Sequence, residues 1–391
     1  MNAYDWIVIG AGITGSAIAY ELSKLGCRVL LLDPMVNSDR ATRYSYGMIC
    51  WYGASGAIGQ LLLEGKARHE VLSEELGMDT QFQRRQMLFT LDCHNDLNLE
   101  ATIARYQHLD EGFELLEPEE ARKVEPLLNP RAIAGALSIE QGHVNPVALN
   151  QAYQQGIERH GGKIVPGRVE QLQGNGKGCA IATSEETYYA EQAIVCAGGW
   201  TRQLLSNAGI KIPVYFTHAE LIEIPDCPFR LSTIVTSVNS DRTHLEEQAS
   251  RAENETLWNQ PGRELAPSII DADAVQFRGG RLLFGQISRA LSDPNARVNA
   301  QQSQQAMRER IEGMLPSLGQ CRGNWHSCLV AFSHKRLAVL GPVPGMERVH
   351  LFSGFTTPMI LAPAIAPRFA RQLTGTPDSL LAELGLFLVQ C

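Results

Sequence analysis

Short apolar runs and one amphipathic segment alternate over the first 33 residues. Residues 6–9 are all apolar, a pattern typical of a strand that is buried on both faces. Residues 16–25 have helical periodicity and good helix formers, and Gly26 follows them as a stop signal. Residues 27–32 form a second, mostly apolar run with Asp33 at its end. The pattern predicts one strand–helix–strand unit.

Similar signals recur along the rest of the chain. From residue 214 to residue 284 hydrophobic and polar positions alternate with period two, which predicts an antiparallel sheet. Residues 240–266 are polar and match neither a helix nor a strand pattern. Helices are expected at 57–76, 147–160, 301–315 and about 362–373, and short buried strands at 163–165 and 193–197.

A glycine motif connects the first predicted strand to its helix. Gly10, Gly12 and Gly15 have the Gly-x-Gly-x-x-Gly spacing, and Asp33 follows 18 residues after Gly15. The first glycine permits a tight turn, the second lets the backbone approach a pyrophosphate, and the third allows close helix packing. The helix N-terminus favours phosphates, and an acid at the position of Asp33 accepts hydrogen bonds from ribose hydroxyls. The motif therefore predicts a dinucleotide site.

The motif alone does not distinguish FAD from NAD. It lies at the start of the chain, and segments beyond residue 140 are expected to return to the same sheet. NAD enzymes tend to keep the nucleotide-binding fold contiguous. The position of the motif therefore favours FAD.

Several further segments resemble those of a known family. They are SYGMI at 45–49, GHVNP at 142–146, VCAGGW at 195–200, and two C-terminal segments at 340–342 and 352–363. Their order and spacing resemble the FAD-dependent amine and amino-acid oxidoreductases of the D-amino acid oxidase superfamily, which includes glycine oxidase, monomeric sarcosine oxidase and D-amino acid dehydrogenase. The resemblance implies hydride removal from a C–N bond next to a carboxylate, which gives an imine.

The glycine motif and the resemblance together imply a set of cofactor-binding residues. In the family the segment at 45–49 passes the isoalloxazine ring. A helix N-terminus after Gly354 is expected to supply the positive charge that reduced flavin needs. The expected FAD-binding residues are Gly10, Gly12, Ile13, Thr14, Gly15, Asp33, Ser45, Gly47, Met48, Val169, Ala197, Gly198, Trp200, Gly354, Thr356 and Thr357.

The chain departs from the family where the substrate carboxylate would be bound. Glycine-oxidase-like enzymes use an Arg, and a count without gaps from Gly341 places Val330 at that position. The C-terminal segment also has neither the His nor the Lys of sarcosine oxidase. Either the cation comes from elsewhere or the substrate is not a simple amino acid. Among the candidate cations, Arg43 is favoured because it neighbours the flavin segment. The full set of candidates is Arg43, His218, Lys335 and Arg336.

The same count places Cys328 where sarcosine oxidase carries the cysteine that is bonded to its flavin. A thiolate beside an electron-poor flavin has the chemistry to form a thioether. A free Cys is more often a small buried hydrophobe, and the flanking residues differ from the sarcosine-oxidase pattern. Non-covalent FAD is therefore favoured over a covalent link. Arg43, Cys328 and Arg336 are the expected catalytic residues.

These inferences predict a fold of the α/β plus α+β class with two domains. A discontinuous Rossmann-like FAD-binding domain is expected from residues 1–85, 140–215 and 325–391. Residues 86–139 and 216–324 are expected to form a substrate or cap domain, whose antiparallel sheet roofs the flavin.

Composition narrows the partners and the compartment. No apolar window is long enough to span a membrane, and the N-terminus has no signal-peptide pattern. The net charge of −8, without a Lys/Arg cluster, argues against a nucleic-acid partner. The nine cysteines are scattered and form no CxxC pair, so no metal site is expected. A reducing, cytoplasmic location fits this cysteine usage best.

The leading functional hypothesis is an FAD-dependent oxidoreductase, oxidase or dehydrogenase, that acts on the C–N bond of an amino acid or secondary amine. Glycine, sarcosine and D-amino acids represent this small-molecule substrate class. The alternatives are a 2-hydroxy-acid oxidoreductase and a flavin-bearing subunit with little turnover. Between Lys211 and Lys335 the chain has no lysine that would help oxygen accept an electron, so oxygen and a carrier stay open as acceptors. The oligomeric state also stays open.

Overall fold

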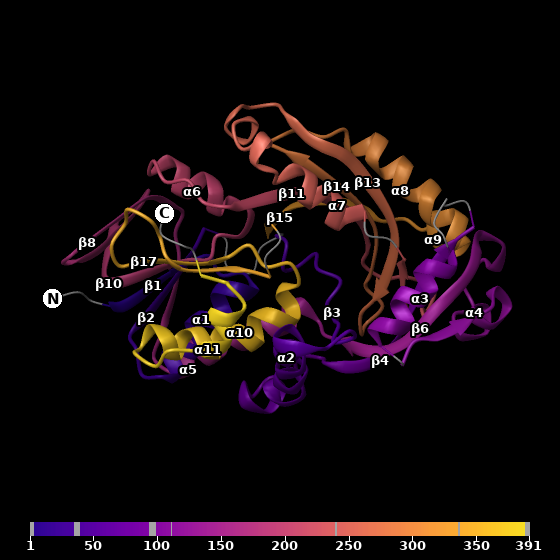
Figure 1. The fold of residues 1–391 in the computed structure, drawn as a ribbon, viewed down its shortest axis with the longest axis horizontal. Helices are drawn as coiled ribbons and strands as arrows, with labels where there is room; N and C mark the ends of the chain where they lie inside the picture. The colour runs from indigo at the N-terminus through magenta and orange to yellow at the C-terminus, as the bar shows by residue number, and fades with distance from the viewer. Residues whose placement is uncertain are drawn as a thin grey trace.

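Two β-sheets form the frame of the molecule (Figure 1). The computed structural model describes residues 4–34, 40–93, 99–110, 112–238, 241–334 and 337–387. The first sheet, here called sheet A, has the strand order β16-β17-β10-β1-β2-β7, and β8 and β9 extend it from β10. Its strands are β1 (Tyr4–Ile9), β2 (Val29–Asp33), β7 (Lys163–Pro166), β8 (Val169–Asn175), β9 (Gly178–Thr183), β10 (Thr187–Val195), β16 (Val339–Pro342) and β17 (Val349–Ser353).

The centre of sheet A is parallel and buried. β1 pairs in parallel with both β2 and β10, β10 with β17, and β2 with β7. The helix α1 (Ile13–Lys24) joins β1 to β2, so the predicted strand–helix–strand unit is confirmed. Because parallel strands end at the same edge of a sheet, the residues that follow β1, β2, β10 and β17 gather at one edge.

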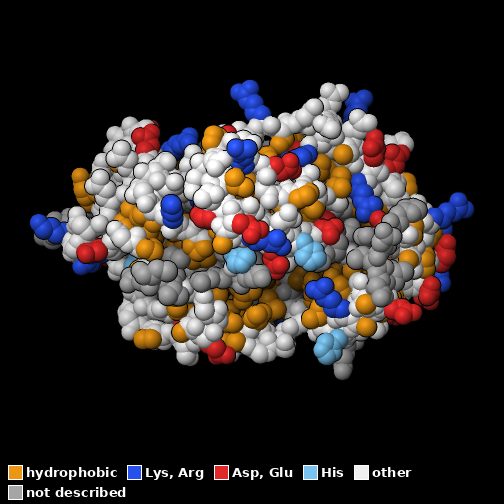
Figure 2. Space-filling view, turned by 45° about the horizontal axis from the view of Figure 1, so that its top comes forward, with side chains coloured by type: hydrophobic (Ala, Val, Ile, Leu, Met, Phe, Trp, Pro, Cys, Tyr) orange, Lys and Arg blue, Asp and Glu red, His pale blue; other side chains and the backbone are white. Residues whose placement is uncertain are grey.

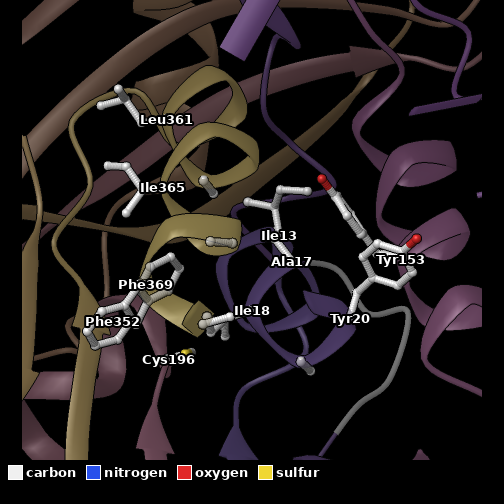
Figure 3. Packing of buried hydrophobic residues seen from close by; sticks show 14 of the residues in the cluster. Ile13, Ala17, Ile18, Tyr20, Tyr153, Cys196, Phe352, Leu361, Ile365 and Phe369 are labelled. Carbon is white, nitrogen blue, oxygen red and sulfur yellow. The ribbon is translucent and has the colours of Figure 1, made fainter. Parts of the chain in front are cut away.

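A layer of helices covers one face of sheet A. It consists of α1, α2 (Gly56–Glu75), α5 (Pro146–Arg159) and α10 (Pro358–Leu373), whose buried side chains share one core with the sheet. In Figure 3, Phe369 of α10 stacks on Phe352 of β17 with ring centroids 5.5 Å apart, and Tyr20 of α1 contacts Tyr153 of α5. The opposite face packs against β8, β9 and α6 (Thr201–Asn207).

The C-terminal helix begins earlier than the sequence pattern indicates. It was expected from about residue 362, but α10 starts at Pro358. Proline is favourable in the first turn of a helix, whereas the interior prolines Pro363 and Pro367 each remove a backbone hydrogen bond and weaken the helical signal. The short helix α11 (Ser379–Glu383) follows it.

The second sheet, sheet B, is mainly antiparallel and has the order β15-β11-β14-β13-β12-β4-β6-β3, with β5 beside β6. The antiparallel sheet expected over residues 214–284 is therefore confirmed, although β12 pairs with β4 in parallel. Its strands are β3 (Met48–Ile49), β4 (Gln83–Asp92), β5 (Glu114–Leu116), β6 (Ile133–His143), β11 (Val214–Ile224), β12 (Ile234–Ser237), β13 (Glu264–Gln276), β14 (Leu282–Leu291) and β15 (Asn324–Ser333).

Sheet B has an outer face and an inner face. On the outer face Phe284 packs against Met307 of α8 (Ala300–Met314). On the inner face Leu221 and Leu283 pack against Tyr46. Figure 1 shows α8 along the outside of the curved sheet. The remaining helices are α3 (Leu99–Leu109), α4 (Pro118–Val124), α7 (Asp241–Ala249) and α9 (Pro316–Gly319), with 3-10 turns at Pro130–Ala132, Gly198–Trp200, Ala252–Asn254 and Leu257–Asn259.

The polar stretch at 240–266 resolves into α7, two 3-10 turns and the start of β13. Within α7 only Leu245 and Ala249 are buried, so the helix carries almost no amphipathic pattern. This explains why the sequence pattern indicated no element there.

The structure gives the mixed parallel and antiparallel fold that was expected, while the domain limits stay a prediction. All four predicted breaks, after residues 85, 139, 215 and 324, fall inside strands, namely β4, β6, β11 and β15, and β15 belongs to sheet B. Among the described residues no helix combines the length and apolar character that crossing a membrane requires. On the face shown in Figure 2, positive and negative side chains are interspersed.

Candidate functional site

The glycine motif forms the closely packed turn between β1 and α1. Gly10 has a φ of +107°, and a Cβ there would lie 2.4 Å from the carbonyl oxygen of Cys196. A Cβ on Gly15 would lie 1.8 Å from the carbonyl oxygen of Gly10. Gly12 is the N-cap of α1, and Ile13 and Thr14 begin its first turn. Only glycine fits at Gly10 and Gly15, as the predicted phosphate-binding turn requires.

Asp33 and Thr42 hold this turn from the neighbouring segments. Oδ2 of the buried Asp33 accepts a hydrogen bond from the N–H of Ala11 at 2.9 Å. Oγ1 of Thr42 accepts from the N–H of Ile13 at 3.0 Å. Asp33 thus lies at the end of β2 beside the glycine turn, and its hydrogen bonds to the ribose stay a prediction. Thr42 was not predicted from the sequence, because no motif links it to a helix 29 residues earlier.

Further predicted cofactor residues lie at the same edge of sheet A. Ala197 follows β10, and its Cα would be 3.2 Å from a Cβ on Gly10. Gly198 and Trp200 form the 3-10 turn after it, and Gly198 has a φ of +55°. Val169 begins β8, two residues after Gly167, whose N–H donates to the carbonyl of Asp33 at 3.0 Å.

The segment at 45–49 connects this edge to sheet B. Gly47 has a φ of +67°, and a Cβ there would lie 2.1 Å from the carbonyl oxygen of Val144. The N–H of Gly47 donates to Oγ of Ser45 at 3.2 Å. Met48 pairs with His143 in β6, which brings the 142–146 motif beside the 45–49 segment. The two segments that carry the family resemblance are therefore direct neighbours.

The C-terminal segment turns at Gly354 after β17. Gly354 has a φ of +70°, and its carbonyl accepts a hydrogen bond from Oγ of Ser333 at 3.0 Å. The N–H of Thr356 donates to the carbonyl of Leu337 at 3.1 Å. Thr357 is the N-cap of α10, so a helix N-terminus follows Gly354. A helix start there provides the partial positive charge that the resemblance implies.

These residues fit a bound dinucleotide that ends in a flavin. The phosphate turn leaves no room for a Cβ at Gly10 and Gly15, and the first turn of α1 presents backbone N–H groups. Asp33 stands at the end of β2. The start of α10 follows β17 of the same sheet, so a helix N-terminus lies after that strand. The assignment of each residue to an atom of FAD stays a prediction.

A cluster of charged side chains joins Arg43 to the inner face of sheet B. The Glu223 side chain is only 5% exposed and lies 3.2 Å from Nη2 of Arg43. Nε of Arg281 also donates to Glu223, and Nε2 of His326 lies 3.1 Å from its Oε2. Burial alone would raise the pKa of Glu223, but the hydrogen bond and charge of Arg281, with Arg43 and His326, hold that pKa below its ordinary value.

This cluster, here called the Glu223 cluster, was only partly predicted. Arg43 was expected as a cation beside the flavin segment, but its partner Glu223 is 180 residues away in the chain. His326 is fixed by Tyr44, whose hydroxyl lies 2.8 Å from Nδ1 and whose ring stacks on the imidazole. Nη2 of Arg281 donates to the carbonyl of Arg43 at 3.0 Å. Two guanidinium groups and an imidazole thus converge on one carboxylate.

Two aspartates of β13 form a second polar group on the inner face. Oδ1 of Asp273 accepts hydrogen bonds from Oγ1 of Thr236 at 2.8 Å and from the N–H of Ser237 at 3.0 Å. Burial and the nearby charge of Asp271 raise the pKa of Asp273 to about 7. Arg242 of α7, whose Nε donates to Glu246 at 3.0 Å, contributes a positive charge there. No sequence pattern indicated this group.

The other predicted substrate residues have different environments. Cys328 lies on the inner face of sheet B, and burial raises the pKa of its thiol to about 12. Val330 is two residues further along β15 and pairs with Thr217. His218 is buried, its Nε2 donates to the Asp293 carbonyl at 2.9 Å, and burial holds its pKa below the ordinary value. Lys335 and Arg336 lie outside the described residues.

Comparison with known proteins identifies the family of the chain. The family model for FAD-dependent oxidoreductases matches residues 5–372. The uncharacterized oxidoreductase YurR of Bacillus subtilis (strain 168) is 27% identical over 71% of this chain and 82% of its own. Hydrogen cyanide synthase subunit HcnC of Pseudomonas aeruginosa is 23% identical over 94% of this chain and 97% of its own.

A solved structure shows the same fold. The crystal structure of glycine oxidase from Geobacillus kaustophilus superposes with a TM-score of 0.79 at 22% identity and covers 98% of both chains. FAD is the cofactor of the family, and the phosphate turn, Asp33 and the start of α10 fit that cofactor. From these matches and this geometry, the chain is a member of the FAD-dependent oxidoreductase family.

Proposed function

We propose that this enzyme oxidises the C–N bond of an amino acid or of a secondary amine that carries a carboxylate. The observation that carries the proposal is the Glu223 cluster, which gathers Arg43, Arg281 and His326 beside the 45–49 segment. FAD, when bound, accepts the hydride from the carbon next to nitrogen. The protein then has to hold the carboxylate and to keep the amine in its reactive, neutral form.

Arg281 is the best placed cation for the substrate carboxylate. Its side chain is 18% exposed, and Glu223 and the Arg43 carbonyl fix its guanidinium on two sides. A planar guanidinium binds carboxylates through paired hydrogen bonds, and prior fixation lowers the entropy lost on binding. This arrangement replaces the arginine that related enzymes carry where Val330 stands. The name of the structurally similar glycine oxidase supports an amino-acid substrate.

A second candidate function is that of a flavin-bearing subunit of a larger enzyme. One relative, which covers 94% of this chain, is named as a subunit of hydrogen cyanide synthase. In that case the flavin would pass its electrons to a partner protein instead of to oxygen. The site chemistry would be the same, and only the route of reoxidation would differ.

Anaerobic reduction of the flavin tests the proposal directly. The purified holoprotein is mixed without oxygen with sarcosine, glycine, D-proline and 2-hydroxyglutarate, and the visible flavin band is followed. We expect at least one amine to bleach the band. Bleaching by 2-hydroxyglutarate alone would replace C–N oxidation with 2-hydroxy-acid oxidation. No bleaching by any compound of these classes would contradict the proposed reaction.

Substitution of Arg281 tests the carboxylate site. Arg281→Met removes the guanidinium, and we expect the concentration of substrate for half-maximal flavin reduction to rise about 100-fold, as loss of a charge-assisted hydrogen-bond pair implies. Arg278→Met is the matched control, because Arg278 is three residues away, exposed, and paired with the exposed Asp79. Equal effects of both substitutions would refute a specific role of Arg281.

A further inference from the structure

We propose that Asp273 binds the positively charged nitrogen of the substrate and takes its proton, with Asp271 adjusting the charge of the site. This inference rests on the proposed C–N oxidation. An amino acid or amine is an ammonium ion at neutral pH, and its nitrogen has no free electron pair in that state. A proton acceptor beside the flavin segment would generate the reactive amine.

Asp273 is held in a fixed orientation on the inner face of sheet B. Both donors from β12, Thr236 and the N–H of Ser237, bind its Oδ1. Asp273 pairs across the ladder with Gly285, and the Gly285 carbonyl accepts a hydrogen bond from the Tyr46 hydroxyl at 2.9 Å. The charge of Asp273 also acts on Tyr46, so the carboxyl group lies near the 45–49 segment. Both hydrogen bonds go to Oδ1, which leaves Oδ2 to take a proton.

The charges around Asp273 favour a cation. Asp271 projects from the same face two residues earlier, because side chains alternate along a strand. Arg242 forms an ion pair with Glu246, four residues further along α7. Among these four side chains, the negative charges outnumber the positive one. Tyr46 and Cys328, which also face the group, have raised pKa values through burial and stay neutral near pH 7.

The acidity of Asp273 suits proton transfer near neutral pH. Burial and Asp271 raise its pKa to about 7, where a base is both ionised in part and able to hold a proton. In the step, the N–H bond of the ammonium breaks and an O–H bond forms at Oδ2. The electron pair stays on nitrogen and forms the C=N bond as the hydride leaves for FAD, which is the oxidant.

The pH dependence of anaerobic flavin reduction provides the first test. In the wild-type holoenzyme we expect the rate with an oxidisable amine to rise as the pH passes through about 7, because Asp273 must be ionised. Asp273→Asn should lower the rate at pH 7 about 100-fold. Asp271→Asn removes a like charge, so the rise should move to lower pH by about one unit. Asp226→Asn, an exposed carboxylate after β11, is the control and should change nothing.

Binding of a fixed cation provides a test that does not depend on turnover. Trimethylglycine has a permanent positive charge and no N–H, and its binding to the holoprotein is followed through the flavin absorbance. We expect about tenfold tighter binding at pH 8 than at pH 6, the ratio of ionised fractions for a carboxyl with a pKa of about 7. In Asp273→Asn the binding should be weak and independent of pH.

The two tests separate the inference from the proposed reaction. Three results of the binding test would each overturn the inference. Trimethylglycine could fail to bind at pH 8, it could bind to the wild type equally well at every pH, or its binding could be unchanged in Asp273→Asn. Amine oxidation at an unchanged rate in Asp273→Asn would leave the reaction standing without this base. Binding that follows Asp273, with no amine able to reduce the flavin, would support the cation site and refute the proposed reaction. If Asp273→Asn fails to fold, two measurements still test the inference. They are the pH dependence of trimethylglycine binding in the wild type and the shift of the rate profile in Asp271→Asn.

Discussion

Three carboxylates connect segments that are far apart in the chain. Asp33, Glu223 and Asp273 each accept hydrogen bonds from groups far away in the chain. Each is buried or partly buried, so each needs these donors to offset the loss of hydration. Glu223 and Asp273 differ in acidity because their surroundings differ in charge. The hydrogen bond and charge of Arg281, with Arg43, hold the pKa of Glu223 below its ordinary value, whereas burial and the charge of Asp271 raise the pKa of Asp273 to about 7.

Asp33→Ala should weaken FAD binding by about 10- to 100-fold. The change removes the acceptor that we predict for the ribose, and it also removes the acceptor for the Ala11 N–H, which helps to hold the glycine turn. FAD affinity is measured by titrating the apoprotein with FAD and following flavin fluorescence. Asp79→Ala removes an exposed carboxylate and is the control. If Asp33→Ala retained FAD through dialysis as the wild type does, its role in cofactor binding would be wrong.

FAD should be released by acid precipitation, which means that Cys328 forms no covalent bond to it. A thioether requires a thiolate, and burial raises the pKa of Cys328 to about 12, so the thiol stays protonated at neutral pH. The measurement is the fluorescence of the supernatant and of the pellet after precipitation. A pellet that stays yellow in the wild type and becomes colourless in Cys328→Ser would show a covalent link.

At the scale of elements, the turn from β1 into α1 tolerates no added side chain. Gly15→Ala would place a Cβ 1.8 Å from the Gly10 carbonyl oxygen, so α1 would have to move away from the phosphate turn. We expect loss of FAD from the purified protein and a clear fall in Tm. Gly313→Ala is the control, because Gly313 lies in α8 with open space around it. It should be neutral or stabilising by up to about 1 kcal/mol. A yellow, stable Gly15→Ala protein would contradict this packing argument.

The local elements could be predicted from sequence, and the contacts between distant elements could not. The unit from β1 to β2 has short-range signals for each part, namely two apolar runs, a glycine turn and one amphipathic segment. By contrast, Arg43 meets Glu223 only because β11 pairs with β14 and β15 in a particular register. A period-two pattern gives the face of a strand and leaves its neighbours undetermined.

The sequence around Asp271 and Asp273 carries a partial signal for a functional group on the inner face of sheet B. Two acids alternate with Ala272 and Ala274 in a strand whose other buried residues, apart from Gln276 at its end, are apolar. Acidic side chains on the buried face of a strand are rare unless they have a partner or a function. Their burial could be read only once β13 was placed between β12 and β14, with α7 beside it.

At the scale of the whole molecule, the 45–49 segment and its neighbours link the two sheets. Tyr46 bonds to Gly285 of β14, Arg43 pairs with Glu223 of β11, and Met48 pairs with His143 of β6. The same segment lies beside the edge of sheet A that holds the glycine turn. The proposed FAD site therefore depends on both sheets, and neither sheet alone contains the residues that we assign to cofactor and substrate.

Because both sheets contribute to the site, FAD should stabilise them together. We expect a single thermal transition whose Tm rises with added FAD, by about 2.7 kcal/mol in unfolding free energy at 100 times the dissociation constant. Trp6 lies in β1 of sheet A, and Trp325 lies in β15 of sheet B. Two variants, Trp6→Phe and Trp325→Phe, each remove one reporter from the fluorescence signal. Both should give the same FAD-dependent Tm as far-UV circular dichroism. If the Tm rose with FAD in only one of the two variants, the cofactor would stabilise one sheet alone.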